Sequence, residues 1–453
     1  ANINMSSSAY IEESDDARRQ MQSFFAMAQL GYKESLYLDV TARNDWSSTL
    51  AFTERKSRGF FYPSVGLSWI IPKSFSMPSL ISFGKVRASW SKVGNDIPLF
   101  VSNTVGHIAA GGIPQPNDTA PFGTLKPEMS SSFEIGTEWK FFDYRMDVDI
   151  TFYKTNTKNQ LFSLPSSAGA AYKYYFVNAG NIQNMGVELT FGAVPILTNQ
   201  FKWNTTLNFS RNKNEVKKLH DDLASFIQGD EGFSSSYTMR LVEGGSFGDI
   251  YGKALERDKY GAIVYGRDGL PQEIGSGNTA KVGNCNPAFL LGWGNSFTYK
   301  DFSFYFLIDG HFGGDVLAQT QAVLDQTGVS KVSGEARTMG YVDLEGHHIY
   351  NIKGFYEQVG GRNGVTEYYM YDATNIRLRE LSLGYTLPKR LLGRKQFLKK
   401  AELSFVARNL FFIYKKAPFD PDAVLSASNS NQGIDIFGIP TTRSVGFNVK
   451  LSF

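Results

Sequence analysis

Residues 443–453 read R-S-V-G-F-N-V-K-L-S-F and, from Ser444 onward, alternate strictly between polar and apolar side chains. The apolar positions are Val445, Phe447, Val449, Leu451 and Phe453. A period of two predicts a β-strand whose two faces meet different media, and about ten residues is the length of a tilted strand that crosses a membrane. An amphipathic strand of a soluble sandwich has the same alternation, so the remainder of the chain has to distinguish the two.

The composition favours β-structure. Of the 453 residues, 14% are aromatic and 44 are glycine, which is typical of strands joined by many turns. The 46 basic and 43 acidic residues give a formal charge of +3, too small to indicate nucleic acid as a partner. The sequence has no run of about 18 apolar residues, which excludes membrane-spanning helices but not a membrane barrel, because half of each barrel strand is polar. The single cysteine, Cys285, cannot form an internal disulfide.

About thirteen stretches share the alternation of the last strand. They are 24–30, 36–43, 64–71, 86–90, 133–141, 146–152, 187–193, 203–209, 291–299, 302–308, 381–387, 403–407 and 443–453. The polar positions of many of them carry charges, and a lysine or arginine that faces lipid near the membrane centre costs about 2–4 kcal/mol. The charged face therefore requires water, and the sequence predicts a polar lumen.

Short and long connections alternate between these strands without exception. The short turns are 32–35, 72–80, 142–145, 195–200, 299–302 and 388–399, and the long connections are 45–60, 93–131, 159–185, 213–288, 313–375 and 413–442. An up-and-down barrel with short periplasmic turns and long external loops has this arrangement. The fold class that we predict is all-β, an antiparallel transmembrane β-barrel.

Several motifs occur in an order that resembles the SusC/RagA family of TonB-dependent outer-membrane transporters. They are T-A-R-N-D-W-S-S-T-L at 41–50, Y-P-S-V-G at 62–66, L-K-P-E at 125–128 with F-E-I-G at 133–136, N-A-G at 178–180 with N-M-G-V-E-L at 184–189, N-I-R-L-R-E-L-S-L-G-Y-T-L-P at 375–388 and A-R-N-L at 407–410. The motifs extend over nearly the whole chain. By this resemblance, residues 1–453 are the C-terminal portion of the barrel domain, with long external loops at 93–131, 213–288, 313–375 and 413–442.

The resemblance implies what the whole protein does. Family barrels have 22 strands, so about nine strands are expected upstream, preceded by a signal peptide, a small β-sandwich, a TonB-box segment and a plug. The expected function is import of oligosaccharides or peptides across the outer membrane of a Gram-negative cell, driven through TonB, with a SusD-like surface lipoprotein as partner. The terminal strand (Val445, Phe447, Val449, Leu451 and Phe453) resembles the assembly signal of outer-membrane barrels. Outer-membrane lipid surrounds such a barrel.

The sequence shows no pattern that predicts an enzyme, a cofactor or a metal centre. His107, His220, His311, His347 and His348 lack the spacing of a metal site. The acidic residues Asp221, Asp222, Asp230 and Glu231 lack the alternate-oxygen spacing of a calcium loop and are better interpreted as solvated charge, although calcium binding by the loops stays open.

Aromatic residues in the long connections are the remaining candidates. Tyr174, Tyr175, Phe176, Tyr368, Tyr369 and Tyr371 belong to this set. Stacking on a sugar and membership of a membrane-interface girdle explain them equally well. A different class of function, a secreted or periplasmic soluble carbohydrate-binding β-protein, is the alternative; it requires a dry core in place of the polar lumen.

Overall fold

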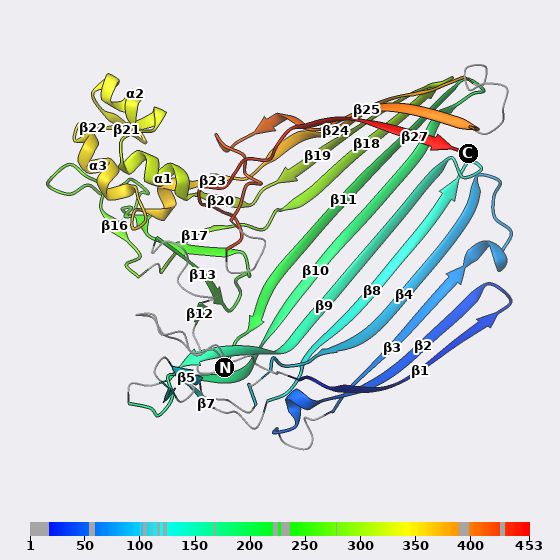
Figure 1. The fold of residues 1–453 in the computed structure, drawn as a ribbon, viewed down its shortest axis with the longest axis horizontal. Helices are drawn as coiled ribbons and strands as arrows, with labels where there is room; N and C mark the ends of the chain where they lie inside the picture. Colours follow the sequence, from blue (N-terminus) through cyan, green and yellow to red (C-terminus); the bar gives the residue numbers. More distant parts are fainter. Residues whose placement is uncertain are drawn as a thin grey trace.

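The computed structural model describes residues 18–53, 59–99, 101–102, 107–109, 112–115, 118–120, 125–166, 169–220, 225–227, 236–277, 279–388, 398–425 and 431–453. In this part of the chain, thirteen strands form one antiparallel sheet in chain order (Figure 1). They are β1 (Met21–Tyr32), β2 (Leu36–Ser47), β3 (Gly59–Ile70), β4 (Ile81–Asn95), β8 (Glu128–Phe141), β9 (Met146–Pro165), β10 (Tyr174–Leu197), β11 (Phe201–Lys218), β18 (Phe289–Tyr299), β19 (Phe302–Phe312), β24 (Asn375–Thr386), β25 (Lys400–Lys415) and β27 (Ser444–Ser452). The predicted fold class and the predicted number of strands are confirmed.

Short strands and helices lie in the connections between these long strands. The strands are β5 (His107–Ala109), β6 (Ile113–Gln115), β7 (Thr119–Ala120), β12 (Ser225–Ile227), β13 (Tyr237–Val242), β14 (Asp249–Gly252), β15 (Ala254–Leu255), β16 (Glu273–Ile274), β17 (Ala280–Asn284), β20 (Asp315–Ala318), β21 (Val342–Leu344), β22 (His347–Ile349), β23 (Met370–Asp372) and β26 (Ile434–Asp435). The α-helices are α1 (Gln319–Gln326), α2 (Lys331–Met339) and α3 (Ile352–Val359), and the 3-10 helices are η1 (Ser48–Leu50), η3 (Ile71–Lys73) and η4 (Thr366–Tyr369). Among the helices of the described residues, none combines the length and the apolar character needed to cross a membrane.

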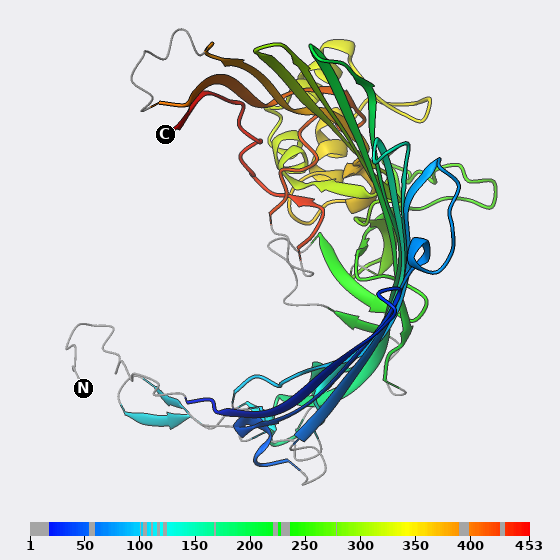
Figure 2. The ribbon, with the colours of Figure 1, turned by 90° about the vertical axis from the view of Figure 1, so that its right-hand side faces the viewer.

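The sheet is a curved wall with two free edges. Figure 2 shows it in cross-section as a C, with β1 at one end and β27 at the other. Adjacent strands twist in one direction, and a sheet of this many strands curls as a result. The wall therefore has the form of part of a large barrel.

The longest connections all lie at one end of the wall, as predicted, although the lengths do not alternate without exception. The short turns are 33–35, 71–80, 142–145, 198–200, 300–301 and 387–399, and the opposite end carries 48–58, 96–127, 166–173, 219–288, 313–374 and 416–443. This arrangement puts all the large insertions on one side of the wall (Figure 1).

One predicted long connection, 159–185, is wrong. β9 continues to Pro165 and β10 begins at Tyr174, so the connection is only 166–173. The two strands bend at a facing pair in the left-handed region, Asn159 with φ 59° and Gly180 with φ 84°. Beyond the bend, the successive residues Leu161 and Phe162 both pack into apolar clusters. The apolar alternation stops there because loops cover both faces of the hairpin, and the strands themselves continue.

The register between the last two strands places apolar side chains on one face and polar side chains on the other. Val449 lies opposite Leu403 and Phe447 opposite Phe405, and the two phenyl rings are 5.7 Å apart. The same face continues across the sheet through pairs such as Phe405 with Leu383 and Leu383 with Phe304. The opposite face pairs polar residues, for example Lys450 with Glu402 and Asn448 with Ser404.

The apolar face is exposed over the whole wall. Phe447 is 76% exposed, and large apolar side chains of most strands are at least a third exposed. Examples are Phe24, Leu67, Trp90, Ile135, Ile150, Val187, Trp293, Leu383, Leu403, Val445, Val449, Leu451 and Phe453. Soluble monomers rarely expose apolar patches beyond a few hundred Å². A lipid environment accounts for this face, whereas the soluble alternative does not.

Val449→Lys tests the assignment of the two faces. It places a charge on the apolar face, which we expect to destabilise the barrel by about 2–4 kcal/mol near the membrane centre and to lower the amount of assembled full-length protein. Outer-membrane abundance and resistance of the folded barrel to unfolding in detergent at room temperature are the measurements. Asn448→Lys, on the adjacent position and the opposite face, is the matched control and should assemble normally. Equal abundance of the two variants would contradict the assignment.

Candidate functional site

Arg87, on the polar face of β4, reaches across β8 to β9. Its guanidinium donates hydrogen bonds to the Asp149 carboxylate at 3.0 and 2.7 Å and to the Thr151 hydroxyl at 2.6 Å. The residue that it crosses is Gly136, where an added Cβ atom would lie 2.8 Å from Arg87 Nε. Gly136 ends the F-E-I-G motif, and the absence of a side chain there leaves room for Arg87 to reach Asp149.

Hydroxyl pairs cover other parts of the polar face. Ser130 pairs with Thr157, and Ser132 with Thr155, with 2.7 Å between the hydroxyl oxygens in each pair. A wall of hydroxyls and ion pairs is suited to water and to polar solutes. We call this surface the inner face, because the last long connection folds onto it on the concave side of the sheet (Figure 2).

Asn178 joins two of the sequence motifs at the end of the wall that carries the long connections. Its side-chain oxygen accepts from the backbone N–H of Lys126 at 2.6 Å, and its side-chain nitrogen donates to the carbonyls of Lys126 at 2.8 Å and Asn159 at 2.9 Å. The L-K-P-E and N-A-G motifs therefore form one contact that fixes the end of connection 96–127 against β10.

The T-A-R-N-D-W-S-S-T-L motif forms a second polar contact nearby. The Tyr62 hydroxyl donates to the buried carboxylate of Asp45, and the hydroxyls of Ser47 and Thr49 donate to Asp96. These contacts hold the end of β2 against β3 and against the start of connection 96–127.

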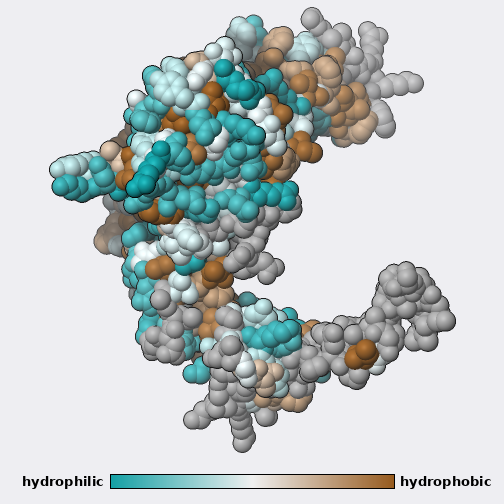
Figure 3. Space-filling view, turned by 90° about the vertical axis from the view of Figure 1, so that its left-hand side faces the viewer, coloured by the Kyte–Doolittle hydropathy of each residue, from teal (hydrophilic) through white to brown (hydrophobic). Residues whose placement is uncertain are grey.

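Three of the four longest connections fold together into a unit that we call the loop domain: the described parts of 236–288, 313–374 and 431–436. Its apolar core comprises Tyr237, Met239, Ile250, Leu255, Ile263, Leu317, Ala318, Ala322, Ala336, Val342, Leu344, Ile349, Phe355, Tyr356, Val359, Val365, Tyr369, Ile434 and Ile436. Residues from all three connections contribute, and β20 pairs with both β23 and β26. The loop domain thus places a rigid, largely hydrophilic surface at the end of the wall (Figure 3).

The structure separates the predicted stacking aromatics into two groups. Tyr369 is 2% exposed and its hydroxyl donates to Asp325 at 3.0 Å, while Tyr368 and Tyr371 pack against the loop-domain core. The Tyr369 ring is buried in the loop domain and is not open to a ligand, whereas Tyr368 and Tyr371 are partly exposed and ligand stacking stays a prediction for them. Tyr174 and Tyr175 are exposed at the start of β10, and ligand stacking stays a prediction for them.

Phe176, the next residue of β10, is different from its exposed neighbours. It is partly buried and packs against the apolar cluster around Leu50 and Leu125. Its ring therefore stabilises the end of the wall.

His347 and His348 are consecutive residues of β22, and each stacks on a different tyrosine. His347 stacks on Tyr265 with 4.0 Å between ring centroids, and His348 stacks on Tyr341 at 3.9 Å. No group of three metal-ligating side chains occurs within the described ranges. The acidic residues Asp221, Asp222, Asp230 and Glu231 lie outside the described residues.

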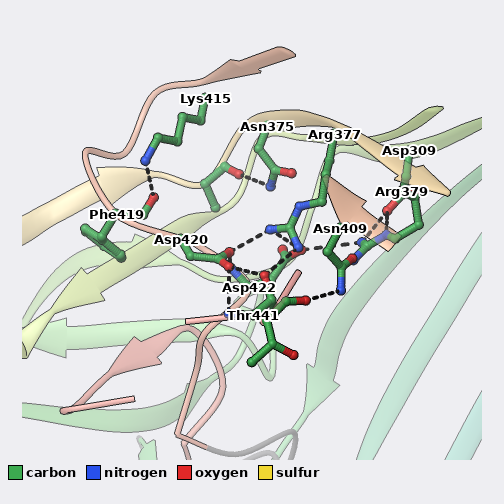
Figure 4. Close-up of polar contacts among 12 residues, drawn as sticks. Asp309, Asn375, Arg377, Arg379, Asn409, Lys415, Phe419, Asp420, Asp422 and Thr441 are labelled. Atoms are coloured by element: carbon green, nitrogen blue, oxygen red, sulfur yellow. Dashed lines mark hydrogen bonds and ion pairs between the residues drawn. The ribbon is translucent and has the colours of Figure 1, made fainter. Parts of the chain in front are cut away.

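A cluster of charged side chains, shown in Figure 4, joins the last long connection to β24. Arg377 is 1% exposed, and its guanidinium donates to the Asp420 carboxylate at 2.7 Å and to the Thr441 hydroxyl at 2.9 Å. Asp422 lies 3.3 Å from the same guanidinium, which also packs over the Phe412 ring at 4.1 Å from the centroid. We call these residues the arginine cluster.

The surroundings of Asp420 favour its charged form. Burial raises the pKa of the Asp420 carboxyl, but the hydrogen bonds from Thr441 and the positive charge of Arg377 outweigh it, so the pKa lies below its ordinary value. A carboxyl with a lowered folded pKa stabilises the fold above its unfolded pKa and loses that contribution as the pH falls through the folded value. The contact is therefore intact at neutral pH.

A β-bulge brings a second arginine to the cluster. The register between β24 and β25 shifts between Leu378 and Glu380, and Asn409 has a left-handed φ of 52°. Arg379 can then donate to Asp309 on β19 and, at 3.2 Å, to the Asn409 side chain. The A-R-N-L motif supplies the bulge, and the sequence signal for the cluster was the pair of arginines inside an otherwise alternating strand.

Comparison with known proteins agrees with this geometry. The family described as "TonB dependent receptor-like, beta-barrel" matches residues 2–410. The chain belongs to this family. It is 26% identical to TonB-dependent receptor P3 of Formosa agariphila over 99% of the chain and 47% of that protein. It is 22% identical to TonB-dependent receptor SusC of Bacteroides thetaiotaomicron over 98% of the chain and 46% of that protein.

A solved structure shares the fold. The RagAB peptide importer in its open-open state superimposes with a TM-score of 0.75 at 19% identity, covering 96% of this chain and 47% of the importer chain. The resemblance to SusC/RagA-type barrels is confirmed, and the chain is part of an outer-membrane barrel. It spans about half the length of the relatives that it matches. Members of this family are receptors and transporters.

Arg377→Met tests the arginine cluster. The change leaves the Asp420 carboxylate, whose side chain is 8% exposed, without its cation. Removing one partner of a buried pair typically costs about 3–5 kcal/mol. In full-length protein on intact cells, we expect added protease to cleave the 416–443 connection at least several times faster than in the wild type, while the amount of barrel stays unchanged.

Arg408→Met is the matched control for this experiment. Arg408 pairs with Glu380 at 3.1 Å but its side chain is 63% exposed, and an exposed pair is worth at most about 1 kcal/mol. Cleavage at the same rate in Arg377→Met and Arg408→Met would show that the cluster does not hold the connection.

Proposed function

We propose that this chain is the C-terminal portion of the barrel of a TonB-dependent transporter that imports oligosaccharides or peptides across the outer membrane. The observation that carries the proposal is the two-faced wall: an apolar face exposed over its whole width and an inner face with charge-bearing contacts such as Arg87 with Asp149. A polar solute that passes through a membrane needs this combination of surfaces.

The free edges of the wall support its being part of a closed barrel. The unpaired backbone groups of β1 and β27 cannot remain in hydrocarbon, where each unsatisfied group costs several kcal/mol. In the complete barrel, which we propose has 22 strands, strands outside the thirteen described here pair with these edges. The chain matches slightly less than half of the length of each relative, which is consistent with a complete barrel of 22 strands.

The partners follow from the same proposal. TonB supplies the energy through a region outside these residues, as in a TonB-dependent receptor. A SusD-like surface lipoprotein covers the external mouth, where the loop domain offers a rigid surface built from three connections. The relatives named SusC and RagAB support this pairing. The connections 96–127, 219–288, 313–374 and 416–443 are external in this proposal.

Cysteine labelling tests the proposed topology. In full-length protein with Cys285→Ser, we expect Asn363→Cys and Ile439→Cys to react on intact cells with a membrane-impermeant maleimide, because both positions are exposed at the end with the long connections. Asn199→Cys, in the short 198–200 turn, should react only after the outer membrane is permeabilised. Labelling of Asn199→Cys on intact cells together with protection of the other two would reverse the orientation.

A further inference from the structure

We propose that a hollow on the apolar face, at the end of the wall with the short turns, binds an anionic phospholipid. The hollow crosses β18, β19, β24, β25 and β27, and most of its lining residues are phenylalanine, tyrosine or leucine. Its volume of about 410 Å³ lies within the range of small-molecule sites, ~300–1,000 Å³. The inference rests on the proposed topology, in which this end is periplasmic, and the periplasmic leaflet of an outer membrane consists of phospholipids.

Two leucines contribute the smaller side chains of the hollow. Leu383 lies between Phe304 and Phe405 in the register of the sheet. Leu403 lies opposite Tyr385 on the neighbouring strand. Because these leucines are shorter than the rings beside them, a trough remains between the aromatic side chains. Leu383 is 52% exposed and Leu403 is 46% exposed, so the trough is open to the hydrocarbon. A flexible acyl chain that enters the trough gains dispersion contacts on several sides, whereas a flat wall offers them on one side only.

A lysine lies beside this hollow. Lys300 directly follows Tyr299, a lining residue, and has a left-handed φ of 52° in the turn 300–301. Its ammonium lies 5.4 Å from the centroid of the Tyr299 ring. Within the described ranges it forms no ion pair, not even with the adjacent Asp301, and its side chain is exposed. The cation–π contact therefore holds an available positive charge next to the trough, where the phosphate of a lipid lies when its acyl chain fills the hollow.

The sequence around this end of the wall adds positive charge. The connection 387–399, which joins β24 to β25, contains five basic residues and no acidic residue. Lys400, at the start of β25, is already paired with Glu402 at 3.0 Å. Basic residues next to a membrane attract anionic lipid head groups. An apolar trough with positive charge at one end matches a lipid whose phosphate carries a net negative charge.

A second turn repeats the lysine without the hollow. Lys33 follows Tyr32, has a left-handed φ of 50°, and its ammonium lies 5.1 Å from the Tyr32 ring centroid. Neither residue lines the hollow. Lys33 therefore provides the same cation on the same kind of ring, and a variant of it separates a lipid site from a general effect of positive charge.

The test measures lipid binding to full-length protein that has been purified in detergent and freed of lipid. Phosphatidylglycerol or phosphatidylcholine with the same acyl chains is added, and the bound lipid molecules are counted by native mass spectrometry. We expect Lys300→Gln to weaken the tightest phosphatidylglycerol site about fivefold and to leave phosphatidylcholine binding unchanged, because it removes one cation. Leu383→Trp fills the trough with an apolar ring and should weaken binding of both lipids about tenfold or more.

Matched controls are Lys33→Gln and Leu67→Trp. Leu67 is an exposed leucine on the apolar face of β3 and does not line the hollow. Both control variants should bind the two lipids as the wild type does. All four variants leave the apolar face apolar, so each should reach the outer membrane in the wild-type amount. Phosphatidylglycerol binding that is the same in Lys300→Gln, Leu383→Trp and the wild type overturns the inference, as does equal affinity of the wild type for the two lipids.

A second copy of the chain is the other occupant that an apolar lining fits. If Leu383→Trp converts a wild-type dimer to monomers and leaves the bound lipid unchanged, the hollow is an interface between copies and the inference is overturned. Absence of lipid binding leaves the transport proposal standing, because that proposal is tested separately by the cysteine-labelling pattern.

Discussion

The constraint on which this structure depends is that hydrocarbon cannot satisfy a backbone hydrogen bond. Every N–H and C=O within the membrane must pair with another strand, so the chain forms one continuous antiparallel sheet whose strands follow each other in order. The membrane also determines the side-chain pattern. A strand with lipid on one face and water on the other must alternate apolar and polar side chains. The pairing of Phe447 with Phe405 and of Lys450 with Glu402 shows both media across one strand pair. The large insertions all lie at one end of the wall, and short turns join the strands at the other end.

The inner face adds a second requirement, that charged side chains satisfy each other while leaving a wet surface. Arg87 meets Asp149 two strands away, and this is possible only because the strand between them has Gly136 at the crossing point. Near the end that carries the long connections, the contacts join loops to strands: Asn178 and the arginine cluster each connect a loop to a strand with several hydrogen bonds.

Strands were predictable from sequence because lipid on one face imposes a period of two, and the last strand shows it in full. The continuation of β9 and β10 past Asn159 and Gly180 could not be predicted from the sequence. Loops cover both faces of the sheet there, so apolar and polar residues no longer alternate around residues such as Phe162. The loop domain was equally hidden, since its core joins residues far apart in the chain and has no period to detect. For the same reason Tyr369 could be taken for a ligand-stacking residue although it is buried beside Asp325. The motifs marked the arginine cluster and the Asn178 contact, but only the register of the sheet shows which groups they join.

The most direct test of this account is a nitroxide scan of β25 in the full-length transporter reconstituted in lipid bilayers. Single spin labels are placed at Glu402, Leu403, Ser404, Phe405 and Val406, and collision with oxygen, which concentrates in lipid, is compared with collision with a water-soluble nickel chelate. The account predicts alternation with a period of two: oxygen contact highest at Leu403 and Phe405, and nickel contact highest at Glu402, Ser404 and Val406, which lie on the inner face. Uniform exposure to the nickel chelate at all five positions would contradict it, because the strand would then have water on both faces.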